Sequence, residues 1–332
     1  MSSPSGSPLA SPRSRSARAL LRASRFATAA AGFAAACVPI YDIAFVRLDQ
    51  NPPHADGLSA PATPGGAQLE SARRELLEAV NEDRAGAGLA PVALDSLATA
   101  AAQAHARAMA DDSFFSHYGL DGEAPYERLA RYGHSGHVRE NLFRWTLRDA
   151  AWRTFDPRRA ERFLMESPGH RATILDPART HVGIGIAVDR SGSSVYVVQE
   201  LVAGYAELSA PRRTRGLEPL TIAGKMRDPT LRPLTIVLRS EPSRSWEAGR
   251  PPGGSYSDGG ESVVSVAGPR QIDWHRDGAF AAQLPGGKGR PGGRLYGVVY
   301  VAPRESVERL LSGGGEPTST QWPGAAFVVE VE

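Results

Sequence analysis

Apolar residues recur at helical spacing near the start of the folded part of the chain. Residues 69–80 place apolar side chains every three or four positions, and Gly86 and Gly88 end this segment. A second segment begins at an Asp95 or Ser96 cap and carries mostly alanine on its apolar face. The pattern therefore predicts two amphipathic helices.

A third helix is predicted where Asp156 precedes Pro157. Aspartate is a favoured N-cap, and proline is favoured at the first helical position. This helix is expected to run to about Glu166, because Pro168 disfavours helical geometry in Ser167. We expect the residues after this Ser-Pro pair to form a turn that leads into a strand.

Two strands are predicted after these helices. In 181–189 large apolar residues alternate with Gly183, Gly185 and Ala187, so one face carries only small residues. Such a face lets a helix approach the strand backbone closely. After a polar turn, 194–201 returns as the antiparallel partner. Helices followed by a hairpin predict an α+β fold in which helices cover a sheet.

The C-terminal part of the chain changes to short strands. Apolar runs alternate with Gly and Pro breaks, which predicts an all-β sandwich, with an Ig-like arrangement as one candidate. In 294–302, Leu295 and Val299 are expected on one face, and Tyr296 and Val298 on the other. The expected elements are strands at 220–226, 234–240, 262–268, 279–284, 294–302 and 326–331, a turn at 273–278 and a short helix at 305–311.

The N-terminal segment has the features of an export signal. Five arginines and no acid precede an eleven-residue run of small and apolar residues, 26–36. The run ends at Cys37 and resembles a bacterial lipobox, whose cysteine becomes lipid-modified after cleavage. The alternative is an ordinary signal peptide cut near Ala36. Residues 1–37 are thus a predicted signal peptide, and the Pro- and Gly-containing segment 38–66 is a predicted flexible linker.

Charge and cysteine content exclude several function classes. Without the five N-terminal arginines the formal charge falls from +2 to −3, which gives no electrostatic reason to expect a nucleic-acid partner. The only cysteine is Cys37, which excludes a disulfide framework, a cysteine-based zinc site and a thiol nucleophile in the folded part. The sequence contains no apolar run of about 18 residues, so no membrane span is predicted.

Six short motifs resemble, in order and spacing, those of the CAP superfamily, the SCP-like domain of secreted bacterial proteins. The motifs are Asn81-x-x-Arg84, His105, FFSHYGLDG (114–122), Glu140-Asn141-Leu142, SPGHRATIL (167–175) and HVGIG (181–185). The resemblance covers 67–205 and implies an α-β-α sandwich with an open cleft. The strand pattern, and not the resemblance, predicts the small all-β sandwich domain at 206–332. In the family, two histidines and two acids line this cleft, and in some members they bind a divalent cation.

When the family's cleft residues are carried over one by one, they match His117, Glu140 and His170. These three residues are also the expected metal ligands. The second acid has no direct match, and Glu166, four residues before His170, is its nearest candidate. Two departures from the family pattern are Leu164 in place of a tryptophan and Arg139 in place of a glycine.

Imidazole and carboxylate ligands suit a divalent cation such as zinc, and a zinc-bound water would support hydrolysis. The alternative is that these histidines only hydrogen-bond to Glu140 and to neighbouring loops. His105 lies on an apolar helical face, which favours a buried structural histidine. His134 and His137 lie in a glycine-containing segment, which favours an exposed loop.

These observations support three hypotheses about function. The first is an exported protein, secreted or anchored by lipid at Cys37, whose cleft binds a lipid, a peptide or another envelope component, with a divalent cation as an optional cofactor. The second is a metal-dependent hydrolase that acts on peptide or envelope polymer. The third is a structural envelope protein with a vestigial cleft. The binding hypothesis is preferred over the other two, and no catalytic residue is assigned.

Overall fold

The computed structural model describes most of the chain beyond residue 63. The described residues are 44–47 (backbone only), 64–147, 150–210, 213–215, 218–240, 262–285, 293–314 and 321–332. All of them belong to one compact unit. Cys37, the predicted signal peptide, most of the predicted linker and the segment 251–261 lie outside the described residues.

The three helices expected from the sequence are present with the expected caps. Asp95 accepts a hydrogen bond from the backbone N–H of Ala98, and Asp156 accepts from those of Arg158 and Arg159. In order, the helices of this α/β part are α2 (Gly66–Gly86), α3 (Ser96–Asp112), α4 (Pro125–Arg131), α5 (Ala151–Thr154), α6 (Pro157–Glu166) and α7 (Pro168–Ile174). None of the described helices is long and apolar enough to cross a membrane.

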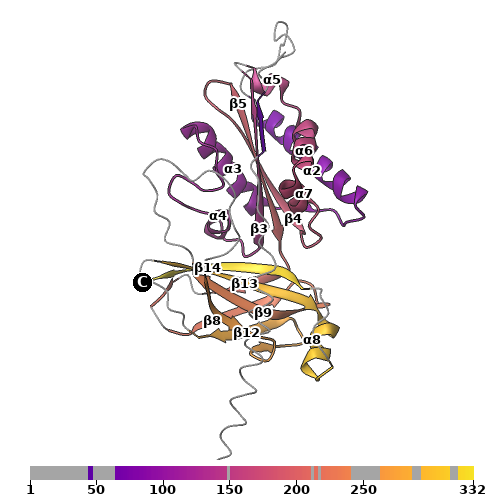
Figure 1. Cartoon of the computed structure of the whole chain (residues 1–332), viewed down its shortest axis with the longest axis vertical. Coiled ribbons are helices and arrows are strands. Elements are labelled where there is room, and N and C mark those ends of the chain that lie inside the picture. The colour runs from indigo at the N-terminus through magenta and orange to yellow at the C-terminus, as the bar shows by residue number, and fades with distance from the viewer. Residues whose placement is uncertain are drawn as a thin grey trace, which may run out of the picture. The chain divides into compact units, whose positions relative to one another are not determined.

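These helices cover both faces of a mixed sheet with the strand order β1-β3-β5-β4-β2. The strands are β1 (Ala44–Arg47), β2 (Ala93–Leu94), β3 (His137–Thr146), β4 (His181–Val188) and β5 (Ser194–Ala203). Helices α3 and α4 lie on one side, and α2, α6 and α7 on the other (Figure 1). The expected α+β class and α-β-α layering are therefore confirmed.

The small-residue face of β4 acts as the sequence predicts. A Cβ atom added to Gly183 would lie 2.2 Å from the carbonyl carbon of Ala98, and one added to Gly185 would lie 2.2 Å from the carbonyl oxygen of Ala102. Both contacts are to the backbone of α3. On the opposite face, Val182, Ile184 and Ile186 join the core formed with α2 and α6. Glycine is thus required where α3 crosses the strand.

Two elements near the motifs differ from expectation. Glu140 lies in the strand β3, which the sequence did not predict. This strand is buried on both faces, so it shows no alternation of apolar and polar residues. After Ser167, which is extended as expected, Pro168 starts α7 and His170 lies inside that helix. Proline interrupts α6 but is favoured at the first position of the next helix.

The predicted linker also differs in one place. Within 38–66, Ala44–Arg47 forms β1, which pairs in parallel with β3 through the register Ala44 to Phe143. The start of the α/β part agrees with expectation, since α2 begins at Gly66. The domain boundaries themselves stay predictions.

The β part is a sandwich of two sheets, with strand orders β10-β9-β13-β14-β7 and β11-β12-β8-β6. All six predicted strands, the turn before Ala279 and the helix at 305–311 are present. The elements are β6 (Ala206–Ser209), β7 (Arg213–Thr214), β8 (Leu220–Met226), β9 (Leu231–Ser240), β10 (Ser262–Ala267), β11 (Ile272–Trp274), β12 (Ala279–Leu284), β13 (Arg294–Pro303), α8 (Arg304–Leu311) and β14 (Trp322–Val331). The two sheets enclose a common core that includes Ile222, Phe280, Ile236, Leu238 and Phe327.

The two faces of β13 have different partners. Leu295, Val299 and Val301 point into the core of the sandwich, as expected. Tyr296, on the other face, stacks with Tyr126 of α4 at a ring-centroid distance of 4.2 Å. The β part therefore buries a second apolar face against the α/β part.

Candidate functional site

His117 and Glu140 form a buried contact on the α3 side of the sheet. His117 lies in the loop after α3, which the chain enters through Ser113 in the left-handed conformation (φ 57°). The Nδ1 atom of His117 is 2.8 Å from Oε1 of Glu140, and both side chains have zero exposed area. Because an ionised carboxylate only accepts, His117 donates this hydrogen bond from Nδ1.

Arg128 approaches Glu140 from α4. Its Nη2 atom is 2.6 Å from Oε2 of Glu140 and also donates to the backbone oxygen of His117 at 3.3 Å. Pro125 at the start of α4, and the side chain of Glu127, which accepts from the Ala124 N–H, fix the start of this helix. Both oxygens of Glu140 are thus bonded within the protein.

A second buried carboxylate, Glu200, lies beside this pair. The register of β3 and β5 pairs Glu140 directly with Glu200, so both side chains lie on the same face. The Nε atom of Arg128 is 3.5 Å from Oε1 of Glu200. The guanidinium group of Arg128 is thus hydrogen-bonded to Glu140 and lies within ion-pair distance of Glu200.

The pKa values of the two carboxyl groups are shifted in opposite directions. Burial and the neighbouring Glu140 raise the pKa of Glu200 well above its ordinary value, although Arg128 opposes the shift. The pKa of Glu140 is lowered, because Arg128 and the adjacent histidines outweigh the effect of burial. Of the two, Glu140 therefore loses its proton first, and Glu200 holds its proton to higher pH.

His105 is a buried structural histidine, as expected. Its Nε2 atom donates to the backbone oxygen of Ser116 at 2.8 Å, and the side chain is 2% exposed. Burial and the charge of Arg128 lower its pKa to about 3. His105 is therefore neutral and fixes the loop that carries His117.

His170 reaches the sheet from the other side. Alternation along β3 places Asn141 opposite to Glu140, on the face that α6 and α7 cover. Asn141 Nδ2 donates to the backbone oxygen of His170 at 3.3 Å. The structure thus brings His117 and Glu140 into contact and places the backbone of His170 on the opposite face. The expected convergence of all three side chains stays a prediction.

A third buried acid lies on this second face. Glu161 of α6 is 1% exposed, and its Oε2 atom accepts from Nε2 of Gln199 at 2.5 Å. No cationic side chain lowers the pKa of this carboxyl group. Burial, together with the negative charge of Asp83, raises its pKa to about 8. Glu161 is therefore mainly protonated at neutral pH.

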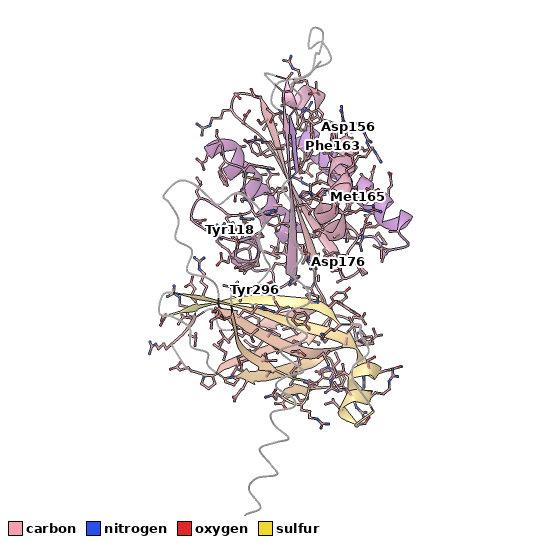
Figure 2. All side chains as sticks on the ribbon, viewed as in Figure 1. Tyr118, Asp156, Phe163, Met165, Asp176 and Tyr296 are labelled. Carbon is pink, nitrogen blue, oxygen red and sulfur yellow. The ribbon has the colours of Figure 1, made fainter. Side chains whose placement is uncertain are left out.

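Glu166 does not lie near Glu140. It is exposed at the end of α6 and lines an open surface pocket of about 360 Å³. The other lining residues are Met165, Pro168, Arg171, Ala172 and Leu175, all from α6, α7 and the residue that follows α7. Met165 and Phe163 lie on the side of the sheet opposite to Tyr118 (Figure 2).

The expectation that His134 and His137 lie in an exposed loop is wrong. They are 8% and 2% exposed. His134 accepts from the backbone N–H of Gly136 at 2.7 Å, and Arg179 approaches Nδ1 of His137 at 3.2 Å. The glycine in this segment permits a tight buried turn rather than a surface loop.

The buried charges do not favour a divalent cation at Glu140. In the part of the chain that the structure describes, no group of three or more His, Cys, Asp or Glu side chains is arranged to hold a metal ion. Arg128 already lies at hydrogen-bonding distance from Glu140. Although burial lowers the pKa of Arg128, the charges of Glu140 and Glu200 outweigh it and raise that pKa. A second cation would face this guanidinium in surroundings of low dielectric constant. Zinc at this site stays an untested expectation that the residues do not fit.

Sequence reasoning missed Arg128, Glu200 and Glu161. The pairing register of β3 and β5 places Glu200 beside Glu140, and the packing of α4 brings Arg128 to both across 72 positions of sequence. Glu161 could have been found, because it lies between apolar residues on the buried face of the predicted third helix.

Comparisons with known proteins concern the α/β part of the chain. The family model described as the cysteine-rich secretory protein family, CAP, matches residues 77–201. The protein YkwD of Bacillus subtilis (strain 168) is 25% identical over 123 residues, which are 37% of this chain and 45% of that protein. The chain thus spans less than half the length of this relative.

Two solved structures are also similar. An outer surface protein of Borrelia burgdorferi is 18% identical with a TM-score of 0.35, over 40% of this chain and 93% of that chain. An extracellular SCP-domain protein of Bacillus anthracis str. Ames is 21% identical with a TM-score of 0.34, over 43% of this chain and 45% of that chain. The assignment rests on the family model and on the Bacillus subtilis relative: residues 77–201 of this chain form a CAP domain of the cysteine-rich secretory protein family.

Proposed function

We propose that this chain is an exported CAP-domain protein that binds a zwitterionic, acyl-chain-bearing ligand of the cell envelope, without catalysis. The observation that carries the proposal is the pocket between α6 and α7. This pocket has a volume of about 360 Å³ and is open to solvent.

The lining of this pocket sets the class of ligand. Met165, Pro168 and Leu175 supply apolar surface that an acyl chain would cover. Glu166 and Arg171 supply one negative and one positive charge at the same opening. A phosphate on Arg171 and an amine or quaternary ammonium on Glu166 would satisfy both charges.

Binding has more support than hydrolysis. The hydrolase hypothesis needs Glu140 or a bound metal ion to activate water, but both carboxylate oxygens of Glu140 are bonded to His117 and Arg128. The side chain also has no exposed area from which to reach a substrate. The structural hypothesis, without any ligand, is the outcome that a negative binding experiment would favour.

Dodecylphosphocholine, used below its critical micelle concentration, combines the required chain, phosphate and quaternary ammonium. In isothermal titration calorimetry the full chain should bind it at one site. Arg171→Gln should weaken binding by about tenfold, because it removes one charge-assisted contact. Ala172→Trp should weaken binding further, because the side chain would fill the pocket.

Controls distinguish a pocket from general surface adsorption. Arg107→Gln and Ala85→Trp alter exposed helical positions that do not line the pocket, and they should leave the affinity unchanged. Dodecyl maltoside, with the same chain and an uncharged head group, should bind more weakly than dodecylphosphocholine. Equal losses in the control and pocket variants would refute the assignment of this pocket.

Attachment to the membrane is a separate prediction. Cys37 is expected to be the lipid-modified first residue of the mature protein, since it is the only cysteine and follows the small-residue run. One lipid chain binds membranes only marginally, so stable attachment requires more than one chain. Mass spectrometry of the mature N-terminus tests this, and Cys37→Ser should release the protein to the medium. An unmodified Cys37, or cleavage elsewhere, would leave a plain secreted protein.

A further inference from the structure

Arg128 lies where two buried carboxyl groups face each other. Glu140 and Glu200 are direct partners across β3 and β5, and both have zero exposed area. Nη2 of Arg128 is 2.6 Å from Glu140, and its Nε is 3.5 Å from Glu200. Arg128 itself is 2% exposed. This arrangement is a cation enclosed by two carboxyl groups and shielded from water.

Without Arg128, the same donors would suit a divalent ion. Two carboxyl groups and a neighbouring imidazole, that of His117, are the ligand types that zinc and similar ions take in proteins. Buried carboxylates need a compensating charge, and either a guanidinium or a metal ion can supply it. The planar guanidinium can bond two carboxyl groups from one side chain and is charged at every pH at which the protein folds.

We propose that Arg128 is a resident cation that takes the place of a metal ion in this CAP domain. The wild-type protein then binds no divalent ion at Glu140. Removal of Arg128 leaves Glu140 without its counter-charge beside Glu200, so that a zinc site appears where the guanidinium was. Zinc then displaces the proton that Glu200 holds, because a metal ligand must be deprotonated. The inference concerns the α3 side of the sheet and does not depend on the pocket between α6 and α7.

Equilibrium dialysis of the full chain against zinc, with metal quantified by mass spectrometry, tests the proposal. Glu140→Gln in the wild-type background measures zinc held elsewhere, for example by surface histidines. Wild type and Glu140→Gln should bind equal amounts of zinc. Arg128→Ala should gain one equivalent, with an affinity at least tenfold above that of the wild type. Adding Glu200→Gln to Arg128→Ala should abolish the gain.

Arg131→Ala is the matched control, since Arg131 is on the same helix but 61% exposed, and it should gain no zinc. Circular dichroism reports whether each variant folds. A folded Arg128→Ala protein without a gain would overturn the proposal. If that variant does not fold, the wild type still decides. One equivalent of bound zinc that is lost in Glu140→Gln would contradict the proposal. Equal zinc binding by the wild type and Glu140→Gln would support it.

Discussion

Gly185→Ala is expected to lower the free energy of unfolding by about 3 kcal/mol. The new Cβ atom would lie 2.2 Å from the carbonyl oxygen of Ala102, and this atom belongs to the backbone of α3. A side chain could rotate away, but a helix backbone must shift as a whole. That shift would disturb the packing that holds His105 and the loop with His117.

Urea unfolding followed by circular dichroism measures this effect. Gly86→Ala is the control, because an added Cβ atom meets nothing within 4 Å at the last position of α2. We expect it to be neutral or slightly stabilising, since alanine favours the helix more than glycine does. If Gly185→Ala proved as mild as this control, α3 would not cross β4 as closely as the structure has it.

Glu161→Gln is expected to stabilise the protein at alkaline pH. The pKa of Glu161 is about 8 in the folded state, against 4.5 for the unperturbed group. A raised pKa means that the folded state binds the proton more tightly than the unfolded state. The contribution of Glu161 to stability is therefore fully present below pH 4.5 and falls by up to about 1.4 kcal/mol per pH unit as the pH rises towards 8.

Glutamine matches the protonated acid in shape and does not ionise, so it removes this loss. At pH 9 we expect the variant to exceed the wild type by roughly 2–4 kcal/mol, and at pH 4 the two should be nearly equal. Urea unfolding at a series of pH values gives the difference. Glu166→Gln, at an exposed position on the same helix, should show no such trend. A wild-type stability that stays level between pH 5 and 8 would contradict a buried neutral Glu161.

Local signals in the sequence predicted much of the fold. The caps at Asp95 and Asp156 lie next to the helices that they start, and the alternation of glycine in 181–189 marks the face that α3 covers. These signals depend on residues within one element. They are therefore visible without knowledge of the tertiary structure.

The site was less predictable, because it depends on contacts between distant elements. Strand β3 is buried on both faces, so its sequence lacks the alternation that would reveal a strand. Consequently the orientation of Glu140 relative to Asn141 could not be derived. Arg128 reaches Glu140 from a seven-residue helix that the sequence did not predict, and this contact changes the expected chemistry of the site.

The most direct test of the central claim is the calorimetric titration of wild-type protein with dodecylphosphocholine before and after removal of metal ions by EDTA. We predict the same affinity in both samples, and the same affinity again in Glu140→Gln, because the pocket between α6 and α7 uses neither a metal ion nor Glu140. Binding that is lost after EDTA treatment and restored by zinc would contradict a metal-independent binding protein.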